Sequence, residues 1–266
     1  MDVNRKLTGR QWATVVALYL ALCSAGSAQS SPAQSSPKSR AVSSAPATPS
    51  ADQILNRYVE AVGGRAAWQK LSSRVSSGTI EVPAMNLSGT VEIHEKAPNQ
   101  VLTVVDLAGA RFRQGFDGTV GWTDDPQNGL REQTGAELAE TRREADFYSP
   151  LNLRNHYTKF TVSGTEKIGD RDTYRVEATT AQGDNPDTVY FDTQTGLPIR
   201  MVSQHHSPEG VSAFKEDLSD YREVDGILLP FTISQTSTDS AFTIRVSEVH
   251  HNVSLDDSQF AEPAVQ

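Results

Sequence analysis

The sequence YFDTQTGLPIRM at residues 190–201 and the sequence DYREVDGILLPF at residues 220–231 share one organisation. In each of them, two runs rich in aromatic and aliphatic residues flank a turn that contains glycine, a pattern typical of an antiparallel β-hairpin. Gly196 and Gly226 tolerate the positive φ angle that such turns require. We therefore expect consecutive hairpins in the second half of the chain.

Apolar and polar side chains alternate along the strands predicted after residue 226. The apolar positions of this region are Ile227, Leu229, Phe231, Ile233, Phe242, Ile244 and Val246. Because successive side chains of a strand point to opposite faces, the predicted sheet has one apolar face and one polar face. Pro198 and Pro230 fit the first position or the edge of a strand, because proline has no amide hydrogen to donate. The chain is therefore expected to form a long antiparallel sheet that covers a core on one side.

The first 28 residues have the organisation of a secretory signal peptide. Basic residues precede the apolar run 12–22, and Gly26-Ser27-Ala28 follows as a small-residue cleavage site. The apolar run is too short to span a membrane comfortably. Leu22 stands directly before Cys23, where a bacterial lipidation motif has a small residue, so we expect an unlipidated mature chain that starts at Gln29. That chain contains no cysteine, and its core must stabilise it without a disulfide.

Composition divides the rest of the chain into three parts. Residues 29–49 consist largely of Ser, Pro and Ala and are expected to form a disordered tether. Residues 50–255 form the predicted domain, and residues 256–266 are expected to be a polar C-terminal tail. The full chain has 24 Lys and Arg residues against 33 Asp and Glu residues, a net charge of −9, and shows no basic patch. Nucleic acids and anionic membrane surfaces are therefore unfavourable partners.

A pair of helices is predicted in front of the strands. Ser50 is expected to cap the first helix together with Gln53, in the arrangement known as a capping box. Gly63-Gly64 then ends this helix, and a second short helix follows over Arg65–Leu71.

Another helix is predicted in the middle of the chain, over Thr134–Phe147. Its apolar spacing places Leu138 on the inner side and leaves Glu140 and Glu144 mostly exposed. Counted before and after this helix, the sequence predicts about eleven or twelve strands. At this number an antiparallel sheet curls towards a barrel.

The chain lacks the residue patterns of a metal centre or of common hydrolases. His205-His206 and His250-His251 are adjacent pairs, so the members of each pair point to opposite faces of a strand and do not chelate one ion. No Gly-x-Ser-x-Gly elbow and no complete phosphate-binding loop occurs. We expect no metal, no cofactor, no catalytic residue and no enzymatic activity.

The sequence READFYSPL at residues 143–151 and the sequence VSGTEKIGDRDTY at residues 162–174 resemble bacterial outer-membrane lipoprotein-sorting proteins. The turns that contain Gly118, Gly196 and Gly226 extend this resemblance, which covers about residues 50–255. It implies the LolA/LolB fold: mainly β (α+β), a strongly curved, unclosed antiparallel β-barrel of about eleven strands with helices on its concave face. LolA and LolB carry acylated lipoproteins across the periplasm. The resemblance therefore also implies a periplasmic location and a hydrophobic ligand.

The apolar face of the predicted sheet is the candidate site for a lipid or an acyl chain. The side chains expected to line it are Tyr58, Trp68, Leu87, Val91, Ile93, Phe112, Phe116, Trp122, Leu138, Phe160, Val176, Phe191, Met201, Leu229, Phe231, Phe242 and Ile244. In a carrier, the ligand lies between these side chains and the mid-chain helix. In the alternative, the same residues form the filled core of a structural or sensing domain that binds another envelope protein. Both hypotheses need the same sequence pattern, and for both we expect a monomer without a transmembrane segment in the mature chain.

Overall fold

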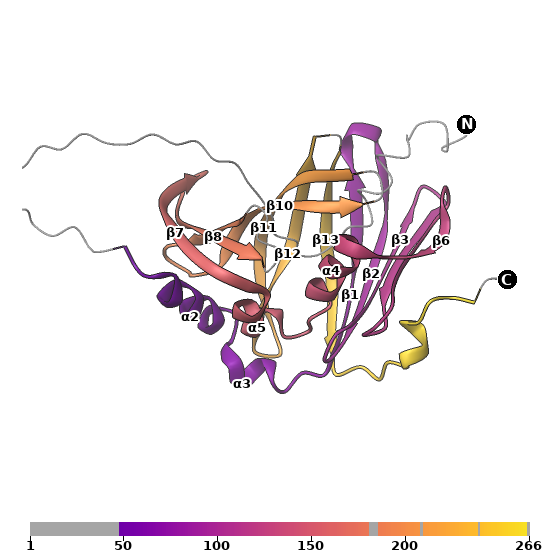
Figure 1. The fold of residues 1–266 in the computed structure, drawn as a ribbon, viewed down its shortest axis with the longest axis horizontal. Coiled ribbons are helices and arrows are strands. Elements are labelled where there is room, and N and C mark those ends of the chain that lie inside the picture. The colour runs from indigo at the N-terminus through magenta and orange to yellow at the C-terminus, as the bar shows by residue number, and fades with distance from the viewer. Residues whose placement is uncertain (1–47, 181–185, 208–209, 239, 265–266) are drawn as a thin grey trace, which may run out of the picture.

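The computed structural model describes residues 48–180, 186–207, 210–238 and 240–264. These residues form one antiparallel sheet of 13 strands in the order β6-β5-β4-β3-β2-β1-β13-β12-β11-β10-β9-β8-β7 (Figure 1). The two edge strands, β6 and β7, are not paired with each other, so the curved sheet is unclosed. The predicted fold class is confirmed. The predicted signal peptide and most of the predicted tether lie outside the described residues.

The strands form two meanders that are joined by one long-range pair. The first meander contains β1 (Ser73–Val82), β2 (Leu87–Lys96), β3 (Gln100–Leu107), β4 (Ala110–Phe116), β5 (Gly121–Asp125) and β6 (Gly129–Glu132). The second contains β7 (Tyr157–Ile168), β8 (Arg171–Thr180), β9 (Asp187–Asp192), β10 (Pro198–Ser207), β11 (Gly210–Val224), β12 (Ile227–Ser237) and β13 (Ala241–His251). Antiparallel pairing of β1 with β13 joins the meanders.

The chain crosses from one edge of the sheet to the other through two helices. These are α4 (Gly135–Glu144) and α5 (Ser149–His156), which connect β6 to β7 and lie within the curve of the sheet (Figure 1). The helices α2 (Ala51–Ala61) and α3 (Gly64–Trp68) precede β1 and lie at the lower rim of the sheet (Figure 1). All four helices therefore belong to the open side of the curved sheet.

The hairpins predicted around Gly196 and Gly226 are confirmed. Gly196 has a φ angle of 80° between β9 and β10, and Gly226 has a φ angle of 83° between β11 and β12. Pro198 begins β10 as expected, but Pro230 lies inside β12, which the sequence did not predict. Pairing of β12 with β13 begins only at Thr232, so no β13 residue is paired with Pro230 and its missing amide hydrogen is not needed there.

The first helix pair follows the predicted pattern. The side chain of Ser50 accepts a hydrogen bond from the amide of Gln53, and the Gln53 side chain accepts one from the amide of Ser50, which confirms the capping box. Gly63 has a φ angle of 108° between α2 and α3. A Cβ atom at Gly63 would lie 2.2 Å from the carbonyl oxygen of Gly226. Only glycine therefore fits where the α2–α3 junction meets the β11–β12 turn.

The predicted mid-chain helix over Thr134–Phe147 is confirmed as far as Glu144 and is wrong for its last three residues. The helix α4 ends at Glu144, and a new helix begins at Ser149. Pro150 lies in the first turn of α5, where proline is well tolerated because the amide hydrogens of that turn have no partner within the helix. Glu140, which was expected to be exposed, is buried because α4 packs into the curve of the sheet.

The strand count of 13 exceeds the predicted eleven or twelve. The strand β6 was not predicted, because its sequence GLRE contains one apolar residue and shows no alternation. The other edge strand, β7, spans Tyr157–Ile168. The additional strand β6 forms one edge of the sheet.

An apolar cluster fills the deep part of the concave side. Its fully buried members come from both meanders and include Ile80, Val91, Ile93, Val105, Leu107, Phe112, Val176, Phe191, Phe231, Ile233, Phe242 and Ile244. The helix α2 contributes Ile54 and Leu55 to the same cluster. A second cluster at the lower rim joins Val62, Trp68, Leu71, Phe147, Leu151, Leu197 and Ile227. The concave side therefore contains a packed core with a separate apolar region under the helices.

Trp122 lies on the convex face, which contradicts its predicted place in the concavity. In β4, Gln114 faces the concave side, because its amide donates to the hydroxyl of Thr141 in α4. Gly115 therefore faces the convex side together with Trp122, its cross-strand partner. Trp122 stands near the start of the short strand β5, where so few alternating residues do not fix which face each side chain occupies.

The C-terminal segment, expected to be a polar tail, packs against the sheet. The helix η3 (Asp257–Gln259) precedes Phe260, whose side chain is completely buried. Lys96 of β2 donates to the carbonyl oxygen of Leu255 and to the carboxylate of Asp257. This segment lies at the lower right of Figure 1. Residues 256–260 therefore belong to the folded domain.

Candidate functional site

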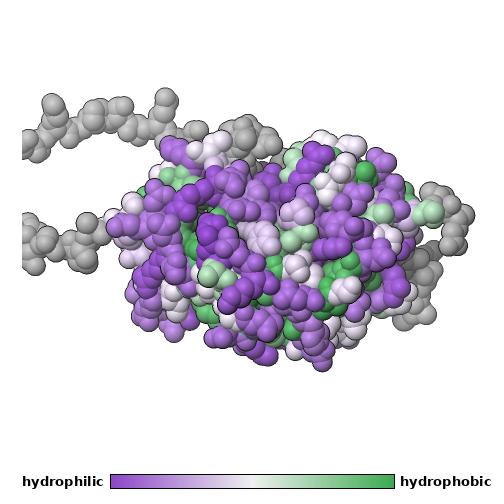
Figure 2. Space-filling view, turned by 90° about the horizontal axis from the view of Figure 1, so that it is seen from below, coloured by the Kyte–Doolittle hydropathy of each residue, from purple (hydrophilic) through white to green (hydrophobic). Residues whose placement is uncertain are grey.

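A cavity of about 90 Å³ lies between the helices and the lower part of the sheet. The helices contribute Tyr58 and Val62 from α2 and Trp68 from α3, and the α4–α5 corner contributes Glu144, Asp146, Phe147, Ser149 and Pro150. The sheet contributes Arg74, Glu95, Pro198, Glu216, Leu218, Tyr221, Leu228, Leu229 and Pro230. Seen from below, the surface around the helices is mainly hydrophilic, with small separate hydrophobic patches (Figure 2).

Aromatic side chains form the apolar wall of this cavity. The rings of Trp68 and Phe147 meet edge to face, with their centroids 6.5 Å apart. The indole nitrogen of Trp68 donates to the carbonyl oxygen of Val62 over 3.1 Å, so the polar atom of this buried ring is satisfied. The ring of Tyr148 packs against Phe147, and its hydroxyl donates to the carbonyl oxygen of Leu71 over 2.8 Å. These contacts hold the α4–α5 corner against α3.

A buried ion pair borders the aromatic wall. The guanidinium group of Arg74 in β1 donates two hydrogen bonds, of 2.5 and 2.6 Å, to the carboxylate of Glu95 in β2. The guanidinium carbon also lies 5.9 Å from the ring centroids of both Trp68 and Phe147, within the range of a cation–π contact. Arg74 is therefore engaged by a carboxylate and by two aromatic faces.

Two further carboxyl groups line the cavity from opposite sides. Glu216 of β11 has a side chain that is 9% exposed and makes no hydrogen bond or ion pair with the part of the chain that the structure describes. Burial raises the pKa of Glu216 to about 7, and the charge of Asp217 adds to this effect. Burial also raises the pKa of Glu144 in α4 well above its usual value, and the charges of Glu140 and Glu216 add to this effect while Arg143 opposes it.

The carboxylate of Asp146, at the α4–α5 corner, has hydrogen-bond partners. Asp146 accepts hydrogen bonds from the Asn152 side chain and from the Tyr148 amide, and its Oδ2 lies 2.8 Å from Nε2 of His156. Burial alone would raise the pKa of Asp146, but these hydrogen bonds outweigh burial and lower it. Asp146 therefore stays ionised and fixes the turn between the two helices.

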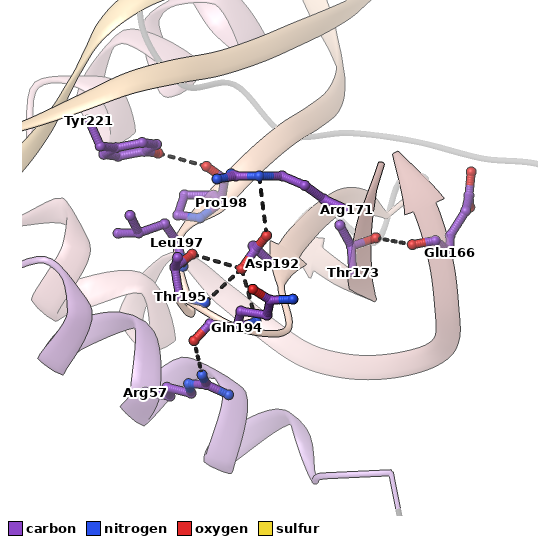
Figure 3. Close-up of polar contacts among 10 residues, drawn as sticks. All are labelled: Arg57, Glu166, Arg171, Thr173, Asp192, Gln194, Thr195, Leu197, Pro198 and Tyr221. Carbon is purple, nitrogen blue, oxygen red and sulfur yellow. Dashed lines mark hydrogen bonds and ion pairs between the residues drawn. The ribbon is translucent and has the colours of Figure 1, made fainter. Parts of the chain in front are cut away.

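Figure 3 shows how α2 is tied to the rim of the sheet. Arg57 of α2 donates to the carbonyl oxygen of Gln194 in the β9–β10 turn (Figure 3). It also donates to the carbonyl oxygen of Thr193 over 2.8 Å. Asp192 shapes this turn by accepting hydrogen bonds from the amides of Gln194 and Thr195 (Figure 3). These hydrogen bonds join α2, which contributes Tyr58 and Val62 to the cavity lining, to the β9–β10 turn.

The structure brings only part of the predicted site together. Tyr58, Trp68 and Leu229 line the cavity. The predicted residues that lie in the main apolar cluster or pack against it are Leu87, Val91, Ile93, Phe112, Phe160, Val176, Phe191, Met201, Phe231, Phe242 and Ile244. Phe116 is fully buried opposite Gly121, and the partly buried Leu138 of α4 lies against the same Gly121. Trp122 lies on the convex face, as described above.

Sequence reasoning missed the charged residues of the cavity. A signal for Glu216 was present, because it stands two residues from both Phe214 and Leu218 in a strand whose inner side chains alternate. A carboxyl group at that position faces inward by periodicity alone. Arg74, Glu95 and Glu144 carried no comparable signal, since a charged residue at the end of a strand or helix is usually exposed.

The described residues contain no group of three or more side chains placed to hold a metal ion. The side chains of His205 and His206 lie outside the described residues, while His251 has Nδ1 2.8 Å from Oδ2 of Asp225. No helix within the described ranges is long and apolar enough to cross a membrane.

No protein-family model matches the sequence, and no curated protein matches it. Solved structures do resemble the chain. A DUF1329 family protein from Desulfovibrio piger matches with a TM-score of 0.53 and 15% identity, over 79% of this chain and 96% of that one. The LolA superfamily protein NE2245 from Nitrosomonas europaea matches with a TM-score of 0.51 and 13% identity, over 80% of this chain and 98% of that one.

The chain has a LolA-like fold. A domain assigned as an outer membrane lipoprotein-sorting protein, from Vibrio parahaemolyticus, shares this LolA-like fold with a TM-score of 0.50 and 12% identity, over 78% of this chain and 94% of that one. In the LolA-like fold of the present chain, α4 and α5 cover the concave side, and the cavity lies where they meet β10–β12.

Proposed function

We propose that the protein is a periplasmic binding or carrier protein that holds a lipid or an acyl chain between the curved sheet and the α4–α5 segment. The observation that carries this proposal is the cavity, whose wall contains Trp68, Phe147 and Leu229 and whose cover is the chain segment that joins the two sheet edges. The first 28 residues would direct export to the periplasm. The assigned role is binding, and no residue is assigned to catalysis.

The cavity volume indicates that a ligand chain enters only when the cover moves. About 90 Å³ is less than the roughly 150 Å³ of a protein cavity that holds one benzene molecule. Pockets for larger ligands have volumes of about 300 Å³ or more. On this proposal, the structure is a closed form whose cavity has room for a head group or a few methylene groups.

The contacts of α4–α5 are of a kind that allows this movement. The hydrogen bonds of this segment include the Phe147 amide donating to the Pro98 carbonyl and the Tyr148 hydroxyl donating to the Leu71 carbonyl. Phe147 and Leu151 also pack in the second apolar cluster, outside the main core. Because α4–α5 runs between two unpaired edges, its displacement breaks no hydrogen bond between strands. Each methylene group then transferred from water contributes about 0.8 kcal/mol to binding. A modest opening would thus bind an acyl chain usefully.

The names of proteins with a similar fold support the same class of ligand. One similar structure is assigned as an outer membrane lipoprotein-sorting protein domain and another as a LolA superfamily protein. Proteins sorted in this way carry acyl chains, which are the hydrophobic ligand that an apolar wall of this kind would bury.

A second function is favoured by the packing of the main core. Ile80, Val105, Phe112 and Ile244 are completely buried, so the deep part of the concave side is already filled by the protein itself. A domain of this kind could act by binding another envelope protein on its surface. The two functions differ in whether the cavity exchanges its contents with solution.

Titration with a fluorescent acyl probe tests the carrier proposal. The mature wild-type chain should bind the probe at one saturable site, and Leu229→Gln should weaken binding at least about tenfold by placing an amide in the apolar wall. Val211→Gln is the matched control, because Val211 is 54% exposed and far from the cavity lining. Absence of saturable binding, together with no lipid in native mass spectra of protein taken from its own periplasm, would refute the carrier and favour the second function.

A further inference from the structure

Glu216 is a buried carboxyl group within an otherwise uncharged row of inner side chains. Its cross-strand neighbours are Met201 of β10 and Gln235 of β12, and Leu218 follows it on the same face of β11. Its side chain is nine-tenths buried and lacks a hydrogen-bond or ion-pair partner among the described residues. Burying a carboxyl group without a hydrogen-bond partner costs folding free energy, so a functional role is the explanation to test for Glu216.

The helix α4 brings a second carboxyl group to the same cavity. Glu144 and Glu216 both line the cavity, and Oε1 of Glu144 is buried without a hydrogen-bond partner. The charge of Glu216 also raises the pKa of Glu144, in keeping with their places in the lining of one cavity. Two acidic side chains from different elements therefore point into one partly apolar space.

The positive groups near the cavity are committed elsewhere. Arg74 forms a bidentate ion pair with Glu95, and the imidazole of His156 contacts the carboxylate of Asp146. Arg143 directly precedes Glu144 on α4 and lowers its pKa, but Arg143 does not line the cavity.

The strands on either side of β11 add no charge beside Glu216. Its cross-strand neighbours are Met201 of β10 and Gln235 of β12, which are both uncharged. On its own strand, Asp217 forms an ion pair with Arg200. Tyr58 of α2 has a pKa raised by burial and stays neutral. The excess charge of the cavity lining is thus acidic, and Glu144 and Glu216 carry it.

We propose that Glu144 and Glu216 bind the ammonium group of an amine-bearing amphiphile, whose hydrocarbon part lies along Trp68, Phe147 and Leu229. For the hydrocarbon part, this inference rests on the carrier function proposed above. The cavity of about 90 Å³ matches an ammonium group with its first few methylene groups. A carboxylate or phosphate head group would meet two acidic side chains without a free cation. A divalent metal ion needs more ligands than these two carboxyl groups. The described residues contain no group of three or more side chains that could hold one.

Such binding is linked to the release of protons. Without a ligand, burial raises the pKa of both carboxyl groups, that of Glu216 to about 7, so they hold protons at pH values where an exposed glutamate is ionised. An ammonium ion between them favours the ionised forms, so each binding event expels protons. An alkylamine keeps its own charge up to a pH of about 10, as the lysine side chain does. Affinity for the amine should therefore rise with pH between about 6 and 8.

Calorimetric titration with three probes of equal chain length tests the inference. The probes are octylamine, octanol and octanoate, added to the mature full-length chain at pH 6 and pH 8. Octylamine should bind at least about tenfold more tightly than the other two at pH 8, and its affinity should fall at least about tenfold at pH 6. Proton release should appear as a dependence of the binding heat on the ionisation enthalpy of the buffer.

Variants locate the effect. Glu216→Gln and Glu144→Gln should each lower octylamine affinity at least about tenfold and reduce proton release, while octanol binding stays unchanged. Glu248→Gln removes an exposed carboxylate and should behave as wild type. Circular dichroism verifies the fold of each variant, and proton release by the wild-type protein remains informative if a variant does not fold.

The outcomes separate this inference from the carrier function. Equal binding of all three probes without proton release, unaffected by Glu216→Gln, would overturn the amine site and leave the carrier function standing. Failure of all three probes to bind would overturn both.

Discussion

The indole nitrogen of Trp122 donates a hydrogen bond of 2.8 Å to the main-chain carbonyl of Phe260, 138 residues further along the chain. Both side chains are buried, on the convex face of the sheet, which an open antiparallel sheet often leaves to solvent. Phe260 thus extends the core to the outer side of β5. The C-terminal segment acts as a structural element of the domain.

Phe260→Ala should destabilise the protein by about 3 kcal/mol, because it removes a fully buried aromatic side chain. Urea unfolding followed by tryptophan fluorescence measures this loss. Val253→Ala serves as the control, since Val253 is 37% exposed in the same segment and should cost less than about 1 kcal/mol. Equal, small losses in both variants would show that the segment is not part of the core.

Leu138→Ala should cost only about 1 kcal/mol, because Leu138 is partly buried and belongs to neither apolar cluster. Leu107→Ala makes the same chemical change at a fully buried position and should cost about 2–5 kcal/mol. Elements that open during function come from the less stable parts of a protein, and α4 should therefore show the smaller loss. Denaturant unfolding of both variants gives the comparison, and a loss near 4 kcal/mol for Leu138→Ala would argue against a movable α4.

Gly63→Ala should be more damaging than Gly109→Ala, although both glycines have a positive φ angle. A left-handed conformation costs a residue with a Cβ atom about 1–2 kcal/mol. At Gly109 nothing lies within 4 Å of the added atom, so only this cost applies. At Gly63 the added atom overlaps the Gly226 carbonyl and must push the α2–α3 junction away from the β11–β12 turn. Thermal unfolding should show the difference, and equal melting temperatures would contradict close contact between these turns.

The stability of the protein should fall as pH rises from about 4.5 to about 7, in part because of Glu216. The pKa of Glu216 is raised in the folded state, so between these pH values the folded protein keeps a proton that the unfolded chain has lost. The contribution is fully present below pH 4.5 and disappears as pH approaches and passes about 7; over this range it amounts to at most about 3 kcal/mol.

Glu216→Gln should remove this part of the pH dependence, which urea unfolding at pH 5, 6, 7 and 8 can measure. Glu248→Gln should leave the profile of the wild-type protein unchanged. Parallel profiles for wild type and Glu216→Gln would mean that Glu216 ionises normally in the folded protein.

The sequence predicted the sheet well wherever strands were long. Ile233, Phe242 and Ile244 lie on the concave face as their alternation indicates, and Gly226 forms the predicted turn. Over seven or more residues, a period of two leaves one assignment of faces. This is why the fold class could be inferred before any coordinates were considered.

Short or charged segments could not be assigned in the same way. Trp122 lies in β5, a strand of 5 residues, which is too short for alternation to fix a face. Phe260 stands alone in a polar segment, and only the indole of Trp122 and the surface of the sheet explain its burial. Glu144 and Glu216 look like exposed charges, because their environment comes from elements distant in sequence.

The pairing of β1 with β13 has a consequence for how the chain folds. Strands within each meander are neighbours in sequence, so each meander assembles from local hairpins. The seam between them joins the start of the domain to its end: the Asn252 side chain accepts from the Ser72 amide, 180 residues away. Closing so long a loop is entropically unfavourable and slows folding. We expect the seam to form last, and substitutions there to accelerate unfolding while the folding rate stays nearly constant.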